Sequence, residues 1–338
     1  MPTPVRAGRG DSAGATTTRG IARIAVDLLG GDRAPAVVVD GALRACSADP
    51  DVHLLLVGPA AVADEVIAAL APADRSRVLV RATSGPVAVG PSARTDSTVR
   101  AAVAAVAEGR ADAVVSAGAS GASVAAAALL LGRWPDCRRP ALAASLPAVS
   151  GPVVLLDVGA SPDAGPAALA RHAVLGAAYA AVLHAIVAPR IGLLSIGSEP
   201  GKGDRMRRAA SGLLAAAWLP GAARYIGLVE GQEPCLGSSA DVVVTDGFTG
   251  NVLLKGIEGA YAMAGGRESA GVVPHAAALL GVAGTVVVCH GAATGVDLAS
   301  GIALAANLHR RAAMAAIATM IGVAPSRNVA SGAHEPPR

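Results

Sequence analysis

The segment ADAVVSAGASGASVAAAALLLG, residues 111–132, contains the pattern on which the fold prediction depends. A short apolar run leads into SAGASGAS at residues 116–123, and an alanine-rich stretch follows. The apolar run predicts a buried strand, the glycines and serines predict a loop, and the alanine-rich stretch predicts a helix. Free backbone N–H groups at the start of such a helix form an anion site. The alternative is a loop of small residues packed tightly between two elements.

The same order of apolar run, small polar residues and helical stretch recurs along the chain. We predict further buried strands in RIAVDLLGG (23–31), VHLLLVG (52–58), PVVLLDVGA (152–160), RIGLLSIGSE (190–199), ADVVVTDGFTGN (240–251) and TVVVCHGAATG (285–295). Strands that alternate with helices form a mostly parallel sheet covered on both faces. The predicted fold class is therefore α/β. Small polar residues follow the strands, at the edge where open α/β sheets bind ligands.

The composition limits the classes of function. The 338 residues are 53% hydrophobic, which is enough for a large core, and only 2% aromatic, which leaves few stacking platforms for single-stranded nucleic acid. The net charge of +3 comes largely from the two ends, so the body is near neutral and a polyanion-binding role is not expected. We predict one domain over residues 21–324, with disordered ends at 1–20 and 325–338.

The cysteines and the apolar stretches indicate a cytoplasmic protein. Four cysteines are scattered without a CxxC pair, which is typical of free thiols in a reducing compartment and not of a zinc site. The first residues contain no apolar segment like that of a signal peptide. Two long uncharged stretches, 113–132 and 270–289, are interrupted by glycine, serine or proline, so we interpret them as buried strand–helix units and not as membrane spans.

The loop SIGSEPGKGD, residues 195–204, places Lys202 between Gly201 and Gly203. It fails the Walker pattern, because it is one residue short and has Gly203 where a magnesium-binding Ser or Thr is needed. Glycines still allow a backbone to approach an anion, and a lysine can neutralise it. The chain has only two lysines among its 28 basic residues, Lys202 and Lys255, and both lie next to glycine. A phosphate contact and a solvated surface turn remain alternative interpretations of this loop.

A third candidate is TDGFTGN, residues 245–251, in which Asp246 follows a predicted strand. Asn251 is suited to donate to a developing oxyanion, or alternatively to cap the helix that follows, and both roles are compatible. His290 stands at another strand end, where it could contact a ligand. The chain has no GxGxxG, HExxH or GxSxG motif, so we expect no dinucleotide cofactor, no metal and no serine nucleophile.

Taken together, these segments resemble the bacterial phosphate acyltransferase family PlsX. The resemblance runs in order from about Ile21 to Gly259 and includes IAVDLLGGDRAP, ADAVVSAGASGA, LLGRWPDCRRPALAASLPAVSG, LLDVGA, PRIGLLSIGSEPGKGD, YIGLVEG and ADVVVTDGFTGNVLLKGIEG. It implies a three-layer α/β/α fold similar to that of isocitrate and isopropylmalate dehydrogenases. It also implies transfer of a fatty acyl group from acyl carrier protein to inorganic phosphate, without a cofactor, for phospholipid or specialised lipid synthesis.

The resemblance places the reaction centre at Lys202 and Asn251. Phosphate is itself an oxyanion nucleophile, so the chemistry depends on positioning and charge control. Our hypothesis is that Lys202 anchors phosphate and that Asn251 donates to the thioester oxyanion. The remaining expected substrate contacts are Gly30, Gly31, Asp32, Ser116, Gly118, Ser120, Gly121, Asp157, Gly201, Gly203, Asp246, Gly247, Gly250 and His290.

The chain also departs from the family pattern. Ala119 and Ser120 replace an asparagine and a threonine of the family's loop, and Gly165 stands where a lysine is expected. The basic segment before residue 100 reads SARTDSTV here, with Arg94 as the main surviving charge. The helical hairpin expected after Glu258, used in the family for dimerisation and membrane contact, is much shorter. A homodimer is therefore left open without support for the family's usual dimer interface, and we expect the membrane-docking helix to be missing.

Two alternative functions remain open on the sequence. One is a phosphotransacetylase-like enzyme that uses acyl-CoA as the donor. The other is a catalytically degenerate relative that binds carrier protein without turnover, which the changes at Ala119 and Gly165 would favour.

Overall fold

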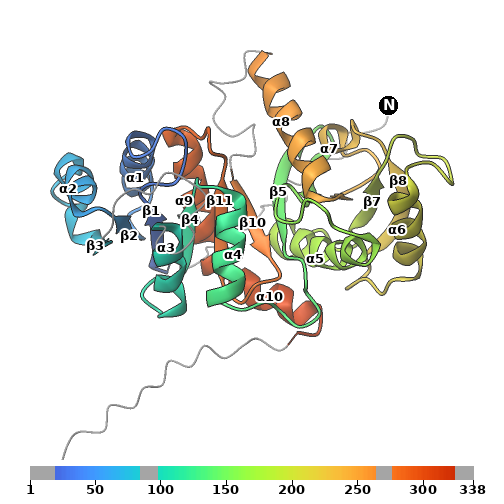
Figure 1. Ribbon diagram of the computed structural model, residues 1–338, viewed down its shortest axis with the longest axis horizontal. Helices are drawn as coiled ribbons and strands as arrows, with labels where there is room; N and C mark the ends of the chain where they lie inside the picture. The colour runs from blue at the N-terminus through green and yellow to red at the C-terminus, as the bar shows by residue number, and fades with distance from the viewer. Residues whose placement is uncertain (1–19, 84–97, 264–275, 324–338) are drawn as a thin grey trace, which may run out of the picture.

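The computed structural model describes residues 20–83, 98–263 and 276–323, and its architecture is that of a long sheet between two helical layers (Figure 1). The predicted disordered ends, Arg94 and most of the segment expected to replace the hairpin lie outside these described residues. The strands are β1 (Ala22–Asp27), β2 (Val52–Gly58), β3 (Val78–Ala82), β4 (Ala113–Ser116), β5 (Ala141–Ala148), β6 (Gly151–Leu156), β7 (Arg190–Leu194), β8 (Arg224–Val229), β9 (Val242–Val244), β10 (Ala276–Leu280) and β11 (Thr285–Cys289).

These strands form one sheet in the order β3-β2-β1-β4-β11-β10-β5-β6-β9-β7-β8. All pairs are parallel except β11–β10, β10–β5 and β5–β6, which are antiparallel and lie in the middle of the sheet. The mostly parallel sheet predicted from the sequence is therefore confirmed. Each predicted apolar run contains a strand, and the register aligns their ends, with Val26 opposite Val115 and Val288 opposite Ser116. The loops that follow β1, β4 and β11 consequently meet at one edge.

The helices cover both faces of the sheet, and this gives the predicted α/β/α layers. One face carries α1 (Ala36–Ala48), α2 (Ala60–Ala69), α5 (Pro166–His184), α6 (Arg205–Ala216), α9 (Gly295–Arg310) and α10 (Ala313–Met320). The other face carries α3 (Thr98–Ala107), α4 (Ser120–Leu130) and α8 (Gly247–Met263), and the short helix α7 (Glu233–Leu236) lies against β5 and β6. Two separate apolar cores result, one on each side of the sheet.

Small residues let the helices pack very close to their neighbours. A Cβ added to Gly41 of α1 would lie 2.5 Å from Leu298 of α9, and one added to Gly176 of α5 would lie 2.7 Å from Val242 of β9. Both distances are below van der Waals contact, so neither position has room for a larger side chain. The abundance of alanine and glycine in the sequence thus serves close packing of helices on the sheet.

Helix α5 is the one described helix that is long and apolar enough to cross a membrane. Its apolar residues include Leu169, Leu175 and Tyr179, all fully buried in the core. A buried core helix of a globular fold has this composition as well, and the packing of α5 against β6 and β9 is of that kind. The uncharged stretch 113–132 forms β4, a loop and α4, as predicted. The described part of 270–289 instead forms two strands, β10 and β11, so the strand–helix unit predicted there is wrong.

Candidate active site

A cavity of about 620 Å³ opens at the carboxyl ends of the parallel strands, between the two halves of the sheet. Ligands of open α/β sheets bind at this edge. Loops after β1, β4 and β11 form one wall, and α8 with the loop after β6 forms the other. The lining residues are Leu29, Gly31, Asp32, Ala117, Gly118, Ala119, Ser120, Leu142, Ala144, Val158, Asn251, Leu254, Lys255, Glu258, Ala276, Ala277, Val288, Cys289, His290, Gly291 and Ala292.

The first wall rests on a buried carboxyl group, Asp27, at the end of β1. Asp27 accepts hydrogen bonds from the hydroxyls of Ser116, at 2.7 Å, and of Thr98. Burial raises the pKa of the Asp27 carboxyl, and these hydrogen bonds oppose the rise only in part. A Cβ on Gly30 would lie 2.6 Å from Asp27 Oδ2, so this loop needs glycine. Ser116 and Gly30, both predicted substrate contacts, therefore support the wall from behind and do not line the cavity.

Helix α4 points its N-terminus into this wall. Ala119 is its N-cap residue and supplies no side-chain cap, so the first turn lacks the hydrogen bond that the family's asparagine could provide. The first N–H groups of a helix have no intrahelical acceptor, and they carry the positive end of the helix dipole. The Ser120 hydroxyl donates to the carbonyl of Gly159, at 3.2 Å, and so links the two walls. The N-terminus of α4 is thus a place for an anion at the cavity surface.

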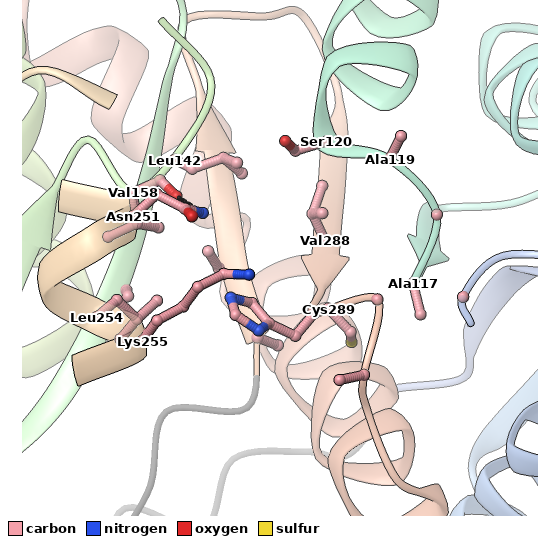
Figure 2. Close-up of a pocket in the computed structure, with 18 of the residues that line it drawn as sticks. Ala117, Ala119, Ser120, Leu142, Val158, Asn251, Leu254, Lys255, Val288 and Cys289 are labelled. Carbon is pink, nitrogen blue, oxygen red and sulfur yellow. Dashed lines mark hydrogen bonds between the residues drawn. The ribbon is translucent and has the colours of Figure 1, made fainter. Parts of the chain in front are cut away.

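The second wall is one face of α8. Asn251, Leu254, Lys255 and Glu258 follow one another at helical spacing and all line the cavity. Figure 2 shows Asn251, Leu254 and Lys255 on α8, opposite Ala119 and Ser120 at the start of α4. The Asn251 amide donates one N–H to the carbonyl of Val158, at 3.0 Å. That bond orients the amide and leaves its second N–H for a ligand.

Close packing sets the position of α8. A Cβ on Gly250 would overlap the carbonyl oxygen of Asp157, and one on Gly247 would lie 2.9 Å from Asp157 Oδ2. These two glycines therefore let α8 approach the loop after β6, and neither lines the cavity. Because α8 begins at Gly247, Asn251 lies in its second turn, and the prediction that Asn251 caps this helix is wrong. Asp246 does so instead, by accepting from Thr249 N at 2.8 Å.

Two predicted carboxylate contacts have structural partners. Asp157 is fully buried and accepts hydrogen bonds from four backbone N–H groups, those of Leu142, Gly159, Ala160 and Ser161. Asp246 forms an ion pair with Arg207 and lies in a separate shallow hollow beside Phe248. Both carboxylates therefore stabilise the loops that follow β6 and β9, and neither lines the cavity.

His290 lines the cavity in the first wall, just after β11. Its Nδ1 faces Glu258 Oε2 at 3.5 Å, and its Nε2 is shielded from solvent without a hydrogen-bond partner among the described residues. Burial lowers the pKa of His290, and the positive charge of Lys255 lowers it further, while Asp297 and Asp32 act in the opposite direction. The lowered pKa therefore favours the neutral form of the imidazole.

Lys202 lies elsewhere. It lines a separate hollow of about 360 Å³ with Pro200, Gly201, Arg208 and Ile226, beside the edge strand β8. Gly201 and Gly203 have φ values of +86° and +87°, and the loop turns back so that Lys202 N donates to Glu199 O at 3.2 Å. The structure thus does not bring Lys202 and Asn251 together in one cavity, contrary to the geometry expected from the sequence.

Of the predicted site residues, six line the cavity: Gly31, Asp32, Gly118, Ser120, Asn251 and His290. Gly121 lies one residue further into α4, outside the lining. The sequence reasoning missed Lys255 and Glu258 as lining residues. The signal was present, because Lys255 and Glu258 follow Asn251 by four and seven residues, a spacing that places them on one helix face. In the described ranges, no group of three or more His, Cys, Asp and Glu side chains is arranged to hold a metal ion.

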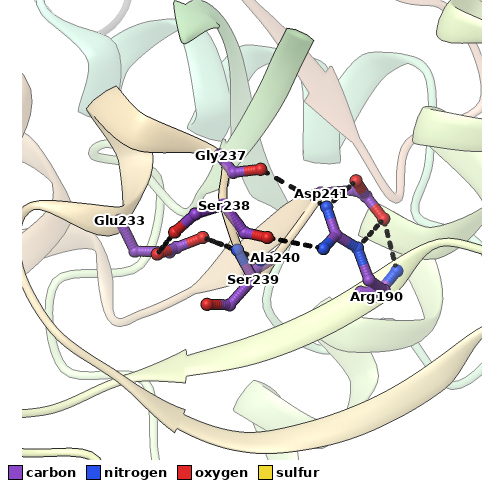
Figure 3. Close-up of polar contacts among 7 residues, drawn as sticks. All are labelled: Arg190, Glu233, Gly237, Ser238, Ser239, Ala240 and Asp241. Atoms are coloured by element: carbon purple, nitrogen blue, oxygen red, sulfur yellow. Dashed lines mark hydrogen bonds and ion pairs between the residues drawn. The ribbon is translucent and has the colours of Figure 1, made fainter. Parts of the chain in front are cut away.

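A second polar cluster lies at the opposite edge of the sheet, where β7 and β9 begin (Figure 3). Arg190 contacts both carboxylate oxygens of Asp241, at 2.8 and 3.0 Å, and donates to the carbonyl of Ser238 at 2.8 Å. Glu233 accepts from Ala240 N at 2.8 Å and from the Ser238 hydroxyl at 3.0 Å. All of these bonds join the loop 237–241 to its neighbours, so the cluster stabilises the fold and is no candidate site.

The fold and the cavity define an α/β protein with an open cavity at the carboxyl edge of its sheet, lined by a helix N-terminus and a lysine. Comparison with known proteins is more specific. The model of the family described as "Fatty acid synthesis protein" matches residues 22–266. The phosphate acyltransferase of Thermobifida fusca (strain YX) is 39% identical over 317 residues, 84% of this chain and 87% of that protein. The phosphate acyltransferase of Pseudomonas syringae pv. syringae (strain B728a) is 42% identical over 250 residues, 72% of each. The chain belongs to this phosphate acyltransferase family, as its motifs predicted.

Solved structures with the same fold are more distant in sequence. The EutD phosphotransacetylase from Staphylococcus aureus aligns with a TM-score of 0.59 at 17% identity, over 88% of this chain and 94% of that one. A 4-hydroxythreonine-4-phosphate dehydrogenase from Klebsiella pneumoniae aligns with a TM-score of 0.54 at 13% identity, over 88% and 100%. At these identities the likeness concerns the fold alone, and it confirms the predicted fold class.

Proposed function

We propose that this protein transfers an acyl group from a thioester to inorganic phosphate in the cavity between α4 and α8. One observation carries the proposal: the N-terminus of α4, which has no side-chain cap, faces Lys255 and Asn251 across the cavity. These are groups for an anionic nucleophile and for a developing oxyanion. Membership of the phosphate acyltransferase family supports the same reaction.

Phosphate binds, in this proposal, between the first turn of α4 and Lys255. The helix N-terminus supplies N–H donors and a positive partial charge, and Lys255 supplies a full charge. Lys255 is the phosphate anchor in this proposal in place of Lys202, because Lys255 lines the cavity and Lys202 does not. Lys202 as the phosphate anchor stays a prediction from the sequence, and the two assignments are separable by mutation.

Asn251 donates its second amide N–H to the thioester oxygen as negative charge develops there. The hydrogen bond to Val158 holds the amide in place before the substrate arrives, so little reorganisation is needed at the transition state. This wall and the strands β5 and β10 at the base of the cavity offer apolar side chains for the acyl group and its thiol, namely Leu142, Ala144, Val158, Leu254 and Ala277. Holding phosphate and thioester side by side supplies roughly 7–11 kcal/mol when the alignment is good.

The finer assignment rests on the family motifs. We infer that the donor is acyl carrier protein and that the acyl phosphate enters phospholipid or specialised lipid synthesis in the cytoplasm. The test is to mix the protein with an acyl-carrier-protein thioester, with and without phosphate. Free thiol is followed spectroscopically, and acyl phosphate is trapped with hydroxylamine. We expect thiol release that requires phosphate and yields hydroxamate.

The outcomes separate the alternative functions. Faster turnover with acyl-CoA than with the carrier-protein thioester would assign the donor to CoA. Binding of carrier protein without phosphate-dependent thiol release from either donor would contradict the proposed activity and favour the non-catalytic alternative.

A further inference from the structure

The proposed reaction leaves one proton to be moved, and this inference rests on that proposed function. Inorganic phosphate near neutral pH attacks as the hydrogen phosphate dianion, which carries one proton. The carbon–oxygen bond forms, the carbon–sulfur bond breaks, and its electron pair leaves on sulfur. The acyl phosphate product carries no proton on its phosphoryl group, whereas the free thiol carries one. The proton must therefore pass from the phosphate hydroxyl to the departing sulfur.

His290 has the position and the free nitrogen for this transfer. It lines the cavity with Lys255 and Asn251, and its Nε2 is buried without a partner among the described residues. Buried polar atoms without partners are rare in proteins, so an unpaired nitrogen in a cavity wall points to a partner on the ligand. On the far side of the ring, Nδ1 lies 3.5 Å from Glu258 Oε2. Such contacts are often long in empty sites and shorten when substrate binds.

Burial, more than the surrounding charges, favours the neutral form of the His290 ring. Lys255 and Glu258 face it from α8, Asp32 from the loop after β1, and Asp297 from α9. Burial and the Lys255 charge outweigh the two aspartates, and the pKa of His290 is lowered from 6.5. We assign the proton of the neutral ring to Nδ1, which lies 3.5 Å from the Glu258 carboxylate, and this leaves the Nε2 lone pair to accept a proton.

We propose that His290 is a catalytic proton shuttle, which takes the proton of hydrogen phosphate on Nε2 as the phosphate attacks and returns it to the thiolate as that leaves. Glu258 is a positioning residue that selects the tautomer and stabilises the transient imidazolium. The ring ends each turnover in its starting state, and no other reactant is needed.

The test uses two donors that differ in how much their sulfur needs a proton. With an alkyl thioester of acyl carrier protein or CoA, we expect His290→Asn to lower kcat by about 100-fold or more, the usual range for general acid–base catalysis. With the 4-nitrothiophenyl thioester of the same acid, the stable thiolate leaves unprotonated. The same variant should then lose less than about 10-fold, because the proton-return step is no longer required. A purely structural role for His290 would lower both rates equally.

The pH profile gives a second readout. With the concentration of hydrogen phosphate dianion held constant, wild-type kcat should fall as the pH drops through the lowered pKa of His290, below 6.5, because the protonated ring cannot accept. His290→Asn should lack this fall.

A matched control is His309→Asn, on α9, whose ring faces Asp112 at 3.7 Å and does not line the cavity. We expect this variant to keep wild-type rates with both donors. If His290→Asn loses kcat equally with both donors, or if its kcat still falls at low pH as in the wild type, the shuttle is overturned while the acyltransferase activity stays established. Absence of phosphate-dependent thiol release in the wild type would instead refute the proposed function itself.

Discussion

The chain's two lysines differ in what surrounds them, although the sequence places both beside glycine. Lys202 lies in a loop that turns back on itself through Gly201 and Gly203, beside the edge strand β8. Lys255 lies on a continuous helix, four residues after Asn251, and faces the large cavity. The family motif directs attention to the first lysine, whereas the cavity contains the second.

The difference shows why a glycine-flanked lysine is a weak indicator by itself. A glycine loop brings an anion close only if its N–H groups converge on a cavity. A lysine on a helix reaches a cavity when the helix face that carries the lysine lines that cavity. Mutation of each lysine tests this contrast between the helix α8 and the loop 195–204, and further variants test how α8 is held and whether the opposite edge of the sheet affects activity.

The largest effect is expected from Lys255→Ala. We predict a fall of about 10- to 100-fold in kcat/KM for phosphate, because hydrogen bonds to a charged group contribute about 1.5–3 kcal/mol. Lys202→Ala is the matched variant, and a change within about 3-fold is expected, since an exposed charge outside the cavity contributes below about 1 kcal/mol. Steady-state kinetics at varied phosphate measure both. The reverse order of effects would show that the loop 195–204 supplies the phosphate anchor.

An intermediate effect is expected from the position of α8. Gly250→Ala would force a methyl group against the Asp157 carbonyl, and overpacking of this kind costs about 1–3 kcal/mol of unfolding free energy. Gly256→Ala, on the same helix, meets nothing within 4 Å and should stabilise by about 0.5–1 kcal/mol through helix propensity. Urea denaturation followed by circular dichroism distinguishes the two. Equal stabilities would mean that α8 is not held where the structure has it.

The smallest effect is expected at the opposite edge of the sheet. Asp241→Asn weakens the ion pair with Arg190, which is partly exposed to solvent, and should lower the unfolding free energy by about 1 kcal/mol. Activity per folded molecule should stay at the wild-type value, because Asp241 does not line the cavity. The variant thus calibrates how much activity is lost through stability alone. A loss of kcat at a temperature where the variant remains folded would contradict this structural role.

The strands that the sequence predicted are those with long apolar runs, for example those preceding Asp27 and Cys289. Such runs are buried on both faces in a parallel sheet, so local composition is sufficient to indicate them. Helix α4 and the loop before it were also predicted from local sequence, because glycines and serines separate an apolar run from an alanine-rich stretch. The edge of the sheet that carries the site was predicted from the small polar residues that follow the strands.

The antiparallel strands β5 and β10 were not predicted, although they join the two halves and form the base of the cavity. Both are rich in alanine, which favours helix as much as strand, so their pairing comes from long-range contacts. The same limitation applies to side chains. Asp157 has the residue type of a ligand contact, but its four backbone N–H partners are assembled only when the loop folds.

By itself, the sequence determined the α/β layers, the family and Asn251 as a cavity residue, because apolar periodicity and motif order are local properties. Only the tertiary structure decided that Lys255, Glu258 and His290 meet in one cavity while Lys202 lies in another hollow. The physical reason is that a cavity is made by loops and helix faces from distant parts of the chain. Their meeting depends on strand order and on how closely glycines such as Gly250 let a helix approach.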